Sequence, residues 1–265
     1  MDTATVESKP LRITREPKVY VVGRQVVSDP EIARFLADEE LTWQTDTEVG
    51  AEQLAEIAGR VCYMSYGKGR KTNEAFVGHI IEVGHGSVLE HGVWSFLITG
   101  VSRSFTHELI RHRHFSYSQL SQRYVDESDS DYIEPDVIAE DPALHAAWTD
   151  AVNAARAAYD QLVAGLESKF TEIPERTLRR KMARQAARSV LPNATETKIF
   201  MTGNARALRH FIELRSSEHA ETEIRKVALA VLRLMQREAP NMFADYRIET
   251  LADGTEVART DHAKV

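Results

Sequence analysis

Prolines set the helix boundaries in the second half of this chain, and they limit what it can fold into. Asp141 stands before Pro142, and an aspartate followed by a proline in the first turn is typical of a helix start. A further helix is expected to open at Pro174 and to end before Pro192, because the residue preceding a proline disfavours helical backbone. These signals predict helices over residues 142–170, 174–191 and 205–238, the last broken near Ser216 and Ser217.

Shorter elements are expected in the rest of the chain. β-Branched and alternating apolar residues predict strands over 18–27, 93–99, 195–202 and 245–250, and helical patterns cover 29–36, 52–64, 72–83 and 104–114. We therefore expect an α+β fold, a single domain dominated by helices. Its expected boundaries are a flexible arm at 1–16, the domain at 17–250 and a polar tail at 251–265.

Charge is unevenly distributed along the chain. The net charge is −7 over 265 residues, which argues against a general nucleic-acid or membrane-surface binder. Residues 126–141 hold eight acids and no Lys or Arg, whereas residues 101–124 hold four Arg and three His against the single Glu108. An acidic protein that gathers its basic residues in this way is expected to bind a compact anion such as a phosphate.

Several common metal-binding and nucleotide-binding motifs are excluded by the spacing of their residues. His107 and His112 are five residues apart, whereas the zinc-protease motif needs four, and nearby arginines would repel a cation, so no metal is expected. No P-loop or dinucleotide-binding glycine pattern is present. The single cysteine, Cys62, has apolar neighbours and no nearby base, which favours a buried structural thiol in a reducing compartment. No apolar run is long enough to span a membrane, so a cytoplasmic location is expected.

The densest polar segment runs from Arg111 to Tyr124. Its first part is expected to continue the preceding helix, and its second part, if extended, places Tyr117, Gln119 and Ser121 on one face with Arg123. Four arginines within twenty-one residues would repel one another unless an anion or buried carboxylates compensated them. A ligand-binding role for this segment is therefore favoured over a purely structural one, in which its polar groups would only cap a loop.

This segment resembles the signature of the flavin-dependent thymidylate synthases, in an actinobacterial-like form. The signature is R-H-R, seven residues, then Ser, which here reads from Arg111 to Ser121. Further matching stretches are GHGSVLEH at 84–91, ARQAARSVLPNATET at 183–197 and LRSSEHAE at 214–221. The resemblance covers most of residues 55–250 and implies that family's fold, with a small, mostly antiparallel sheet.

The resemblance implies synthesis of dTMP from dUMP by reductive methylation. Methylenetetrahydrofolate would donate the carbon, FADH₂ would reduce it, NADPH would regenerate the flavin, and homotetramers would carry active sites at subunit interfaces. The implied FAD residues are Ser87, Arg111, His112, Arg113, Gln119, Asn204, Arg206 and His210. The implied dUMP residues are Glu108, Arg111, Gln119, Leu120, Ser121, Gln122, Arg123, Arg188 and Arg215.

The chemistry of these side chains agrees with the roles that the resemblance implies. Arg123 and Arg188 suit a phosphate. The resemblance places Arg215 beside the pyrimidine, where a fixed cation would stabilise negative charge on the ring, so Arg215 is the expected catalytic residue. Ser121 has no base beside it in sequence and is interpreted as a ligand, so no protein thiolate or alkoxide nucleophile is expected. Two alternatives remain open: a flavin reductase without methyl transfer, and a single-stranded nucleic-acid-binding module.

Overall fold

The computed structural model describes residues 10–265, which form two compact units. Each unit is assembled from segments far apart in the sequence. Unit 1 comprises residues 10–16, 99–107 and 119–199, and unit 2 comprises residues 17–98, 108–118 and 200–265.

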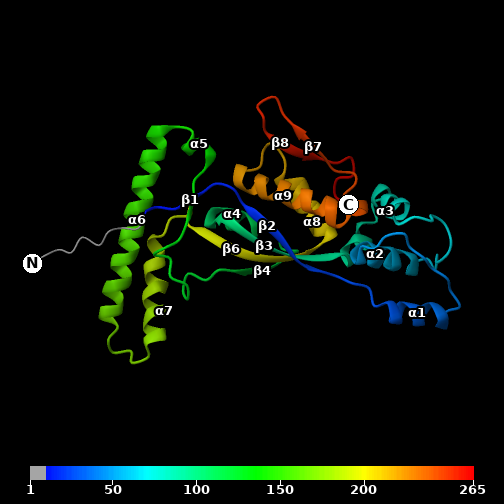
Figure 1. Cartoon of the computed structure of the whole chain (residues 1–265), viewed down its shortest axis with the longest axis horizontal. Coiled ribbons are helices and arrows are strands. Elements are labelled where there is room, and N and C mark those ends of the chain that lie inside the picture. Colours follow the sequence, from blue (N-terminus) through cyan, green and yellow to red (C-terminus); the bar gives the residue numbers. More distant parts are fainter. Residues whose placement is uncertain (1–9) are drawn as a thin grey trace, which may run out of the picture. The chain divides into compact units, whose positions relative to one another are not determined.

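Unit 1 is built on a pair of long helices. Helix α6 (Pro142–Lys169) and helix α7 (Arg176–Ala187) pack against each other, and the short helix η2 (Arg188–Val190) continues α7 (Figure 1). The Asp141 carboxylate accepts hydrogen bonds from the Ala143 and Leu144 amides at 2.8 and 3.2 Å, which caps α6 as its sequence predicts. The smaller elements are α5 (Asp136–Ala139) and the parallel pair β1 (Ile13–Thr14) and β5 (Tyr132–Ile133).

The acidic segment of unit 1 is partly neutralised by arginines. Arg12 pairs with Asp129 and Asp131, and Arg184 of α7 pairs with Asp126 at 2.7 Å. These contacts tie residues 126–134 to both β1 and α7. Three carboxylates of this segment are therefore paired with arginines of the same unit.

Unit 2 packs helices around an apolar centre. Its helices are α1 (Asp29–Asp38), α2 (Gly50–Val61), α3 (Asn73–Glu82), η1 (Gly86–His91), α8 (Ala205–Arg215), α9 (Thr222–Glu238) and η3 (Pro240–Met242). Helix α8 packs on α9 and on η1, and Phe211, Val227 and Leu232 are fully buried there. An antiparallel hairpin, β7 (Arg247–Thr250) and β8 (Glu256–Arg259), follows α9.

A four-stranded sheet has the order β2-β3-β6-β4. Its strands are β2 (Lys18–Arg24), β3 (Val93–Ser102), β6 (Glu196–Asn204) and β4 (Ser116–Gln119), and helix α4 (Arg103–Leu109) follows β3. Burial alternates along β3, where Trp94, Phe96 and Ile98 are buried. Several candidate site residues follow these strands: Glu108 lies on α4 after β3, the run from Gln119 to Arg123 begins at the end of β4, and Asn204 ends β6.

The expected α+β class is confirmed, as are the long helices and their break after residue 215. The expected helix over 104–114 is wrong in its extent, because α4 ends at Leu109 and the chain turns before Arg111. Strands β1, β5 and β8 were not predicted; β1 lies in the expected arm and β8 in the expected tail, and those domain boundaries stay predictions. Residues 1–9 of the arm lie outside the described residues. Across residues 10–265, no helix has the length and apolar character that crossing a membrane requires.

Candidate functional site

Arg215 lies at the centre of a polar cluster in unit 2. At the end of α8, its Nη1 donates to Glu108 Oε2 at 2.8 Å and its Nε donates to His112 Nε2 at 3.0 Å. The Arg215 side chain is 23% exposed, so part of the guanidinium remains accessible. Glu108 and His112 therefore hold a fixed cation whose free edge is available to a ligand.

Aromatic packing fixes the loop that carries His112. Phe115 is buried against Phe211 of α8, with ring centroids 5.9 Å apart. Its ring lies so close to Gly203 that a Cβ at residue 203 would come within 2.3 Å of it, so only glycine fits there. Tyr117 Oη donates to the carbonyls of Leu109 and His112 at 2.7 and 3.1 Å, which closes the turn after α4.

His112 is held in its neutral form. Burial, together with the positive charge of Arg215 and the proximity of His210, lowers the pKa of His112 to about 4. A neutral imidazole has one nitrogen that accepts a hydrogen bond, which is what the Arg215 Nε donor requires. Protonation of His112 would replace this bond with repulsion between two cations.

The His112 pKa predicts a pH-dependent stability. Because the folded pKa lies below the ordinary value of about 6.5, the unfolded chain takes up the proton first as the pH falls. The stability that neutral His112 contributes is complete above about pH 6.5 and is lost as the pH falls to about 4. We expect the unfolding free energy to fall by about 2 kcal/mol more in the parent than in His112→Gln between about pH 7 and pH 5. Urea titrations at each pH measure this difference, and parallel pH profiles of parent and variant would contradict it.

A cavity of about 280 Å³ opens beside Arg215. Its lining combines cationic, imidazole and apolar groups, namely Arg111, His112, Arg113, His114, Phe115, Ala207, His210, Leu214 and Arg215. The structure therefore brings together five residues that the sequence assigned to FAD or dUMP, and Glu108 joins them through Arg215.

The other implied flavin residues of unit 2 lie around η1 and the start of α8. Ser87 is exposed and lines a second cavity of about 470 Å³. Asn204 caps α8 by accepting a hydrogen bond from the Ala207 amide at 2.8 Å, and Arg206 pairs with Glu90 at 2.6 Å. A Cβ at Gly86 would lie 2.9 Å from Arg206 Nε, so glycine at this position lets Arg206 pass close to the Ser87 segment.

The implied dUMP residues from Gln119 to Arg123 belong to unit 1. Gln119 Nε2 donates to Thr106 Oγ1 at 3.1 Å, and Ser121 Oγ accepts from the Arg123 amide at 3.3 Å. The Leu120 amide bonds the Lys198 carbonyl at 2.9 Å, which ties this run to β6. The run is thus an ordered polar turn that presents amide, hydroxyl and guanidinium groups.

Arginine donors gather around this turn. Within the described residues, the Nε atoms of Arg103, Arg123 and Arg184 are buried with no hydrogen-bond partner. Arg103 donates to the Leu120 carbonyl at 2.9 Å; burial is the main cause of its lowered pKa, and the nearby Arg188 charge contributes. Sequence reasoning missed Arg103 as a site residue, although the excess of arginine in 101–124 was the available signal.

The expectation that Cys62 is buried is wrong. Cys62 follows the last residue of α2 and is exposed, with its thiol 3.3 Å from the Ala58 carbonyl oxygen. Its apolar neighbours Val61, Tyr63 and Met64 are also exposed, because the chain leaves the core where α2 ends. Cys62 lines the same 470 Å³ cavity as Ser87.

The arginine-rich polar clusters of this α+β fold suit compact anionic ligands. Residues 45–241 match the model of the family described as thymidylate synthase complementing protein, and the chain belongs to this family. It is 57% identical over 227 residues to the flavin-dependent thymidylate synthases of Mycobacteroides abscessus and Mycobacterium tuberculosis, over 84% of this chain and 90% of each relative. A UMP/dUMP methylase from Streptomyces cacaoi, solved with 5-Br UMP, shares the fold with a TM-score of 0.64 at 21% identity, over 89% of this chain and 96% of that one.

Proposed function

We propose that this chain is a flavin-dependent thymidylate synthase that converts dUMP to dTMP, with methylenetetrahydrofolate as carbon donor and NADPH as the source of electrons. The observation that carries the proposal is the Arg215 guanidinium, fixed by Glu108 and by neutral His112 beside a cavity lined with the R-H-R residues. A preorganised cation at that place stabilises negative charge that develops on the pyrimidine as its imide ionises. Family membership supports the same reaction.

The residues of unit 1 suit the phosphate and the uracil edge of dUMP. Buried, unpartnered guanidinium nitrogens at Arg103 and Arg123 favour a bound oxyanion, and Arg188 adds a further charge. Gln119, Ser121 and Gln122 offer amide and hydroxyl groups for the base, although the Gln119 amide already bonds Thr106. We propose a homotetramer in which this run and the Arg215 cluster reach one dUMP from different subunits.

The residues of unit 2 fit FAD by their chemistry. Arg111 and Arg113 are exposed cations suited to a diphosphate, and His112, His210 and Phe115 offer flat rings beside them. Bound there, the flavin supplies the reducing equivalents for the reaction. The chain's own part is to bind and orient the ligands and to hold the Arg215 charge in place. The exposed free thiol is compatible with a reducing, cytoplasmic location.

No thiolate is needed in this scheme. Cys62 is the single cysteine of the chain and lies outside the Arg215 cavity, whose lining contains no cysteine. We expect Cys62→Ser to retain turnover within about threefold at saturating FAD, since no covalent bond to the pyrimidine is lost. Initial rates of dTMP formation check this. Complete loss of turnover in a folded Cys62→Ser protein would instead indicate a nucleophilic cysteine.

An anaerobic assay of the purified protein tests the proposed function. We expect dTMP only when dUMP, methylenetetrahydrofolate, FAD and NADPH are all present. NADPH oxidation that is independent of dUMP and folate, with no dTMP, would indicate a flavin reductase. Salt-dependent binding to oligonucleotides without bound flavin would indicate a nucleic-acid-binding module.

A further inference from the structure

Arg60 is a buried cation that none of the roles above uses. It lies in the last turn of α2, is 3% exposed, and its guanidinium carbon lies 4.8 Å from the centre of the Phe76 ring. Its Nε donates to Glu56 Oε1 at 2.7 Å. Its Nη atoms donate to three carbonyls of the segment that follows α2, those of Ser65 and Lys68 at 3.0 Å and of Arg70 at 2.8 Å.

The segment held by Arg60 is an irregular loop. Residues 62–72 contain no helix or strand, and Gly67 and Gly69 adopt positive φ angles of 68° and 77°. Besides the Arg60 bonds, the loop is fixed by Tyr66, which is 4% exposed and donates to the Ile57 carbonyl at 3.1 Å. Backbone bonds such as that from the Ser65 amide to the Arg60 carbonyl at 3.0 Å add to its order, but one guanidinium satisfies three of the loop's carbonyls.

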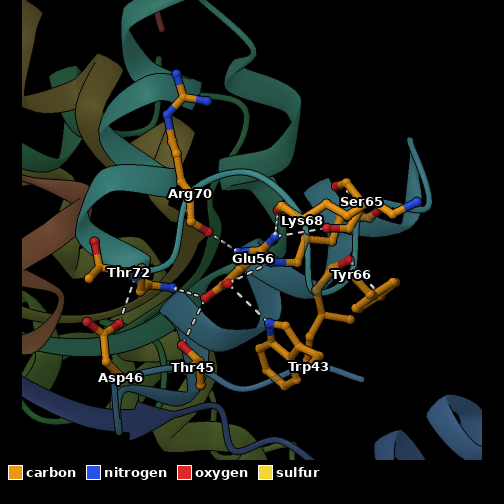
Figure 2. A network of polar contacts seen from close by, with 12 residues as sticks. Trp43, Thr45, Asp46, Glu56, Ser65, Tyr66, Lys68, Arg70 and Thr72 are labelled. Atoms are coloured by element: carbon orange, nitrogen blue, oxygen red, sulfur yellow. Dashed lines mark hydrogen bonds and ion pairs between the residues drawn. The ribbon is translucent and has the colours of Figure 1, made fainter. Parts of the chain in front are cut away.

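Glu56 holds that guanidinium in place. Its carboxylate is fully buried, and besides Arg60 it accepts hydrogen bonds from Trp43 Nε1 at 3.1 Å, Thr45 Oγ1 at 2.8 Å and Asn73 Nδ2 at 2.9 Å (Figure 2). The charge of Arg60 is thus compensated inside the unit by a carboxylate that is itself fully bonded. The pair joins residues 43–45, α2, α3 and the loop into one rigid network.

The outer side of this loop forms a wall of the 470 Å³ cavity. Lys68, Gly69 and Arg70 line it from the loop, whereas His79 lines it from α3, His85 from the residue before η1 and Ser87 from η1. Two basic residues therefore lie beside Ser87, which the proposed function assigns to FAD. An anionic cofactor entering this cavity would meet the loop only in the conformation that Arg60 imposes.

We propose that Arg60, held by Glu56, is a positioning residue for FAD: it shapes the 65–70 loop that completes the cofactor cavity around Ser87. This inference rests on the proposed function, because it takes FAD as the occupant. Arg60 also lines this cavity, but its guanidinium hydrogen bonds go to Glu56 and to the carbonyls of the loop. Its effect is therefore expected on cofactor affinity and loop order rather than on turnover with cofactor bound.

Three variants on α2 test the proposal. Arg60→Lys keeps a positive charge beside Glu56, but its single ammonium has three donors and cannot replace the four bonds that three guanidinium nitrogens make. Glu56→Gln removes the charge that orients Arg60. Glu52→Gln is the matched control, since Glu52 is also fully buried on α2 but bonds Thr47 and Asn241 instead. We expect the dissociation constant for FAD, measured by fluorescence titration of the flavin-free protein, to rise at least tenfold in the first two variants and less than twofold in Glu52→Gln.

Two further readouts separate positioning from general loss of stability. Trypsin cleavage after Lys68, Arg70 or Lys71 should become at least fivefold faster in Arg60→Lys, and turnover at saturating FAD should return to within threefold of the parent. Where Arg60→Lys does not fold, Gly69→Ala replaces it, because a Cβ there meets no atom within 4 Å and only disfavours the positive φ. Unchanged FAD affinity in the folded variant, or equal weakening in Glu52→Gln, would overturn the inference. Failure of the parent itself to bind FAD would instead overturn the proposed function.

Discussion

Arg215→Ala is expected to reduce the turnover number for dTMP formation by about 10²- to 10³-fold, the usual effect of removing one preorganised charge-stabilising group. The variant loses the cation that Glu108 and His112 hold at 2.8 and 3.0 Å beside the cavity. FAD binding should persist, because Arg111, His112 and Arg113 remain. Steady-state dTMP formation and fluorescence titration of FAD measure the two properties separately.

Two control variants test whether the effect of Arg215→Ala depends on the charge of residue 215 and on its position. Arg215→Lys keeps the charge but cannot reproduce both hydrogen bonds, so an intermediate rate is expected. Arg233→Ala removes an arginine of α9 that pairs with Glu256 of β8 at 2.6 Å and does not line the Arg215 cavity, and turnover should stay within twofold. Parent-like turnover in Arg215→Ala would remove Arg215 from catalysis.

Asp245→Asn is expected to lower the unfolding free energy by about 3–5 kcal/mol, because it leaves a buried arginine without its counter-charge. Arg209 is 1% exposed and forms a bidentate pair with Asp245 at 2.7 and 2.8 Å. Arg209 also donates to the Met242 carbonyl at 2.8 Å, and Tyr246 Oη donates to the Arg209 carbonyl at 3.0 Å. The pair therefore links α8, which carries Arg206, His210 and Arg215, to the segment before β7.

Asp261→Asn provides the matched comparison. Asp261 pairs with Arg247 at 2.9 Å, but its side chain is 74% exposed, so solvent screens the interaction and a much smaller loss than in Asp245→Asn is expected. Urea unfolding of both variants at one pH gives the two values. Equal losses would show that the Arg209 pair is not a special source of stability.

Local signals in the sequence were sufficient for most helices. Asp141 and Pro142 mark the start of α6, and the break near Ser216 marks the end of α8, because capping and proline effects act within a few residues. The end of α4 was harder to predict. It depends on the packing of Phe115 against Gly203 and Phe211, residues distant in sequence that no local pattern connects.

The candidate site was predictable in its members but not in its geometry. The signature motif identified Arg111, His112 and Arg113, yet the contact of Arg215 with Glu108 and His112 spans more than a hundred residues of sequence. Cys62 was misplaced because its apolar neighbours resembled a core segment, whereas the end of α2 exposes all of them. The Arg60 network likewise could not be predicted from the sequence, because its acceptors in the loop are backbone carbonyls, which any residue type carries.

A visible absorption spectrum shows whether the protein binds flavin and dUMP next to each other, as the proposed function requires. The purified protein with FAD should be yellow, and addition of dUMP should shift its flavin band saturably, with no comparable shift on addition of deoxyuridine, which lacks only the phosphate that the arginines are expected to bind. Arg123→Met should weaken the dUMP response without removing the flavin. A flavin spectrum that dUMP leaves unchanged at every concentration, or a protein that binds no FAD, would contradict the account.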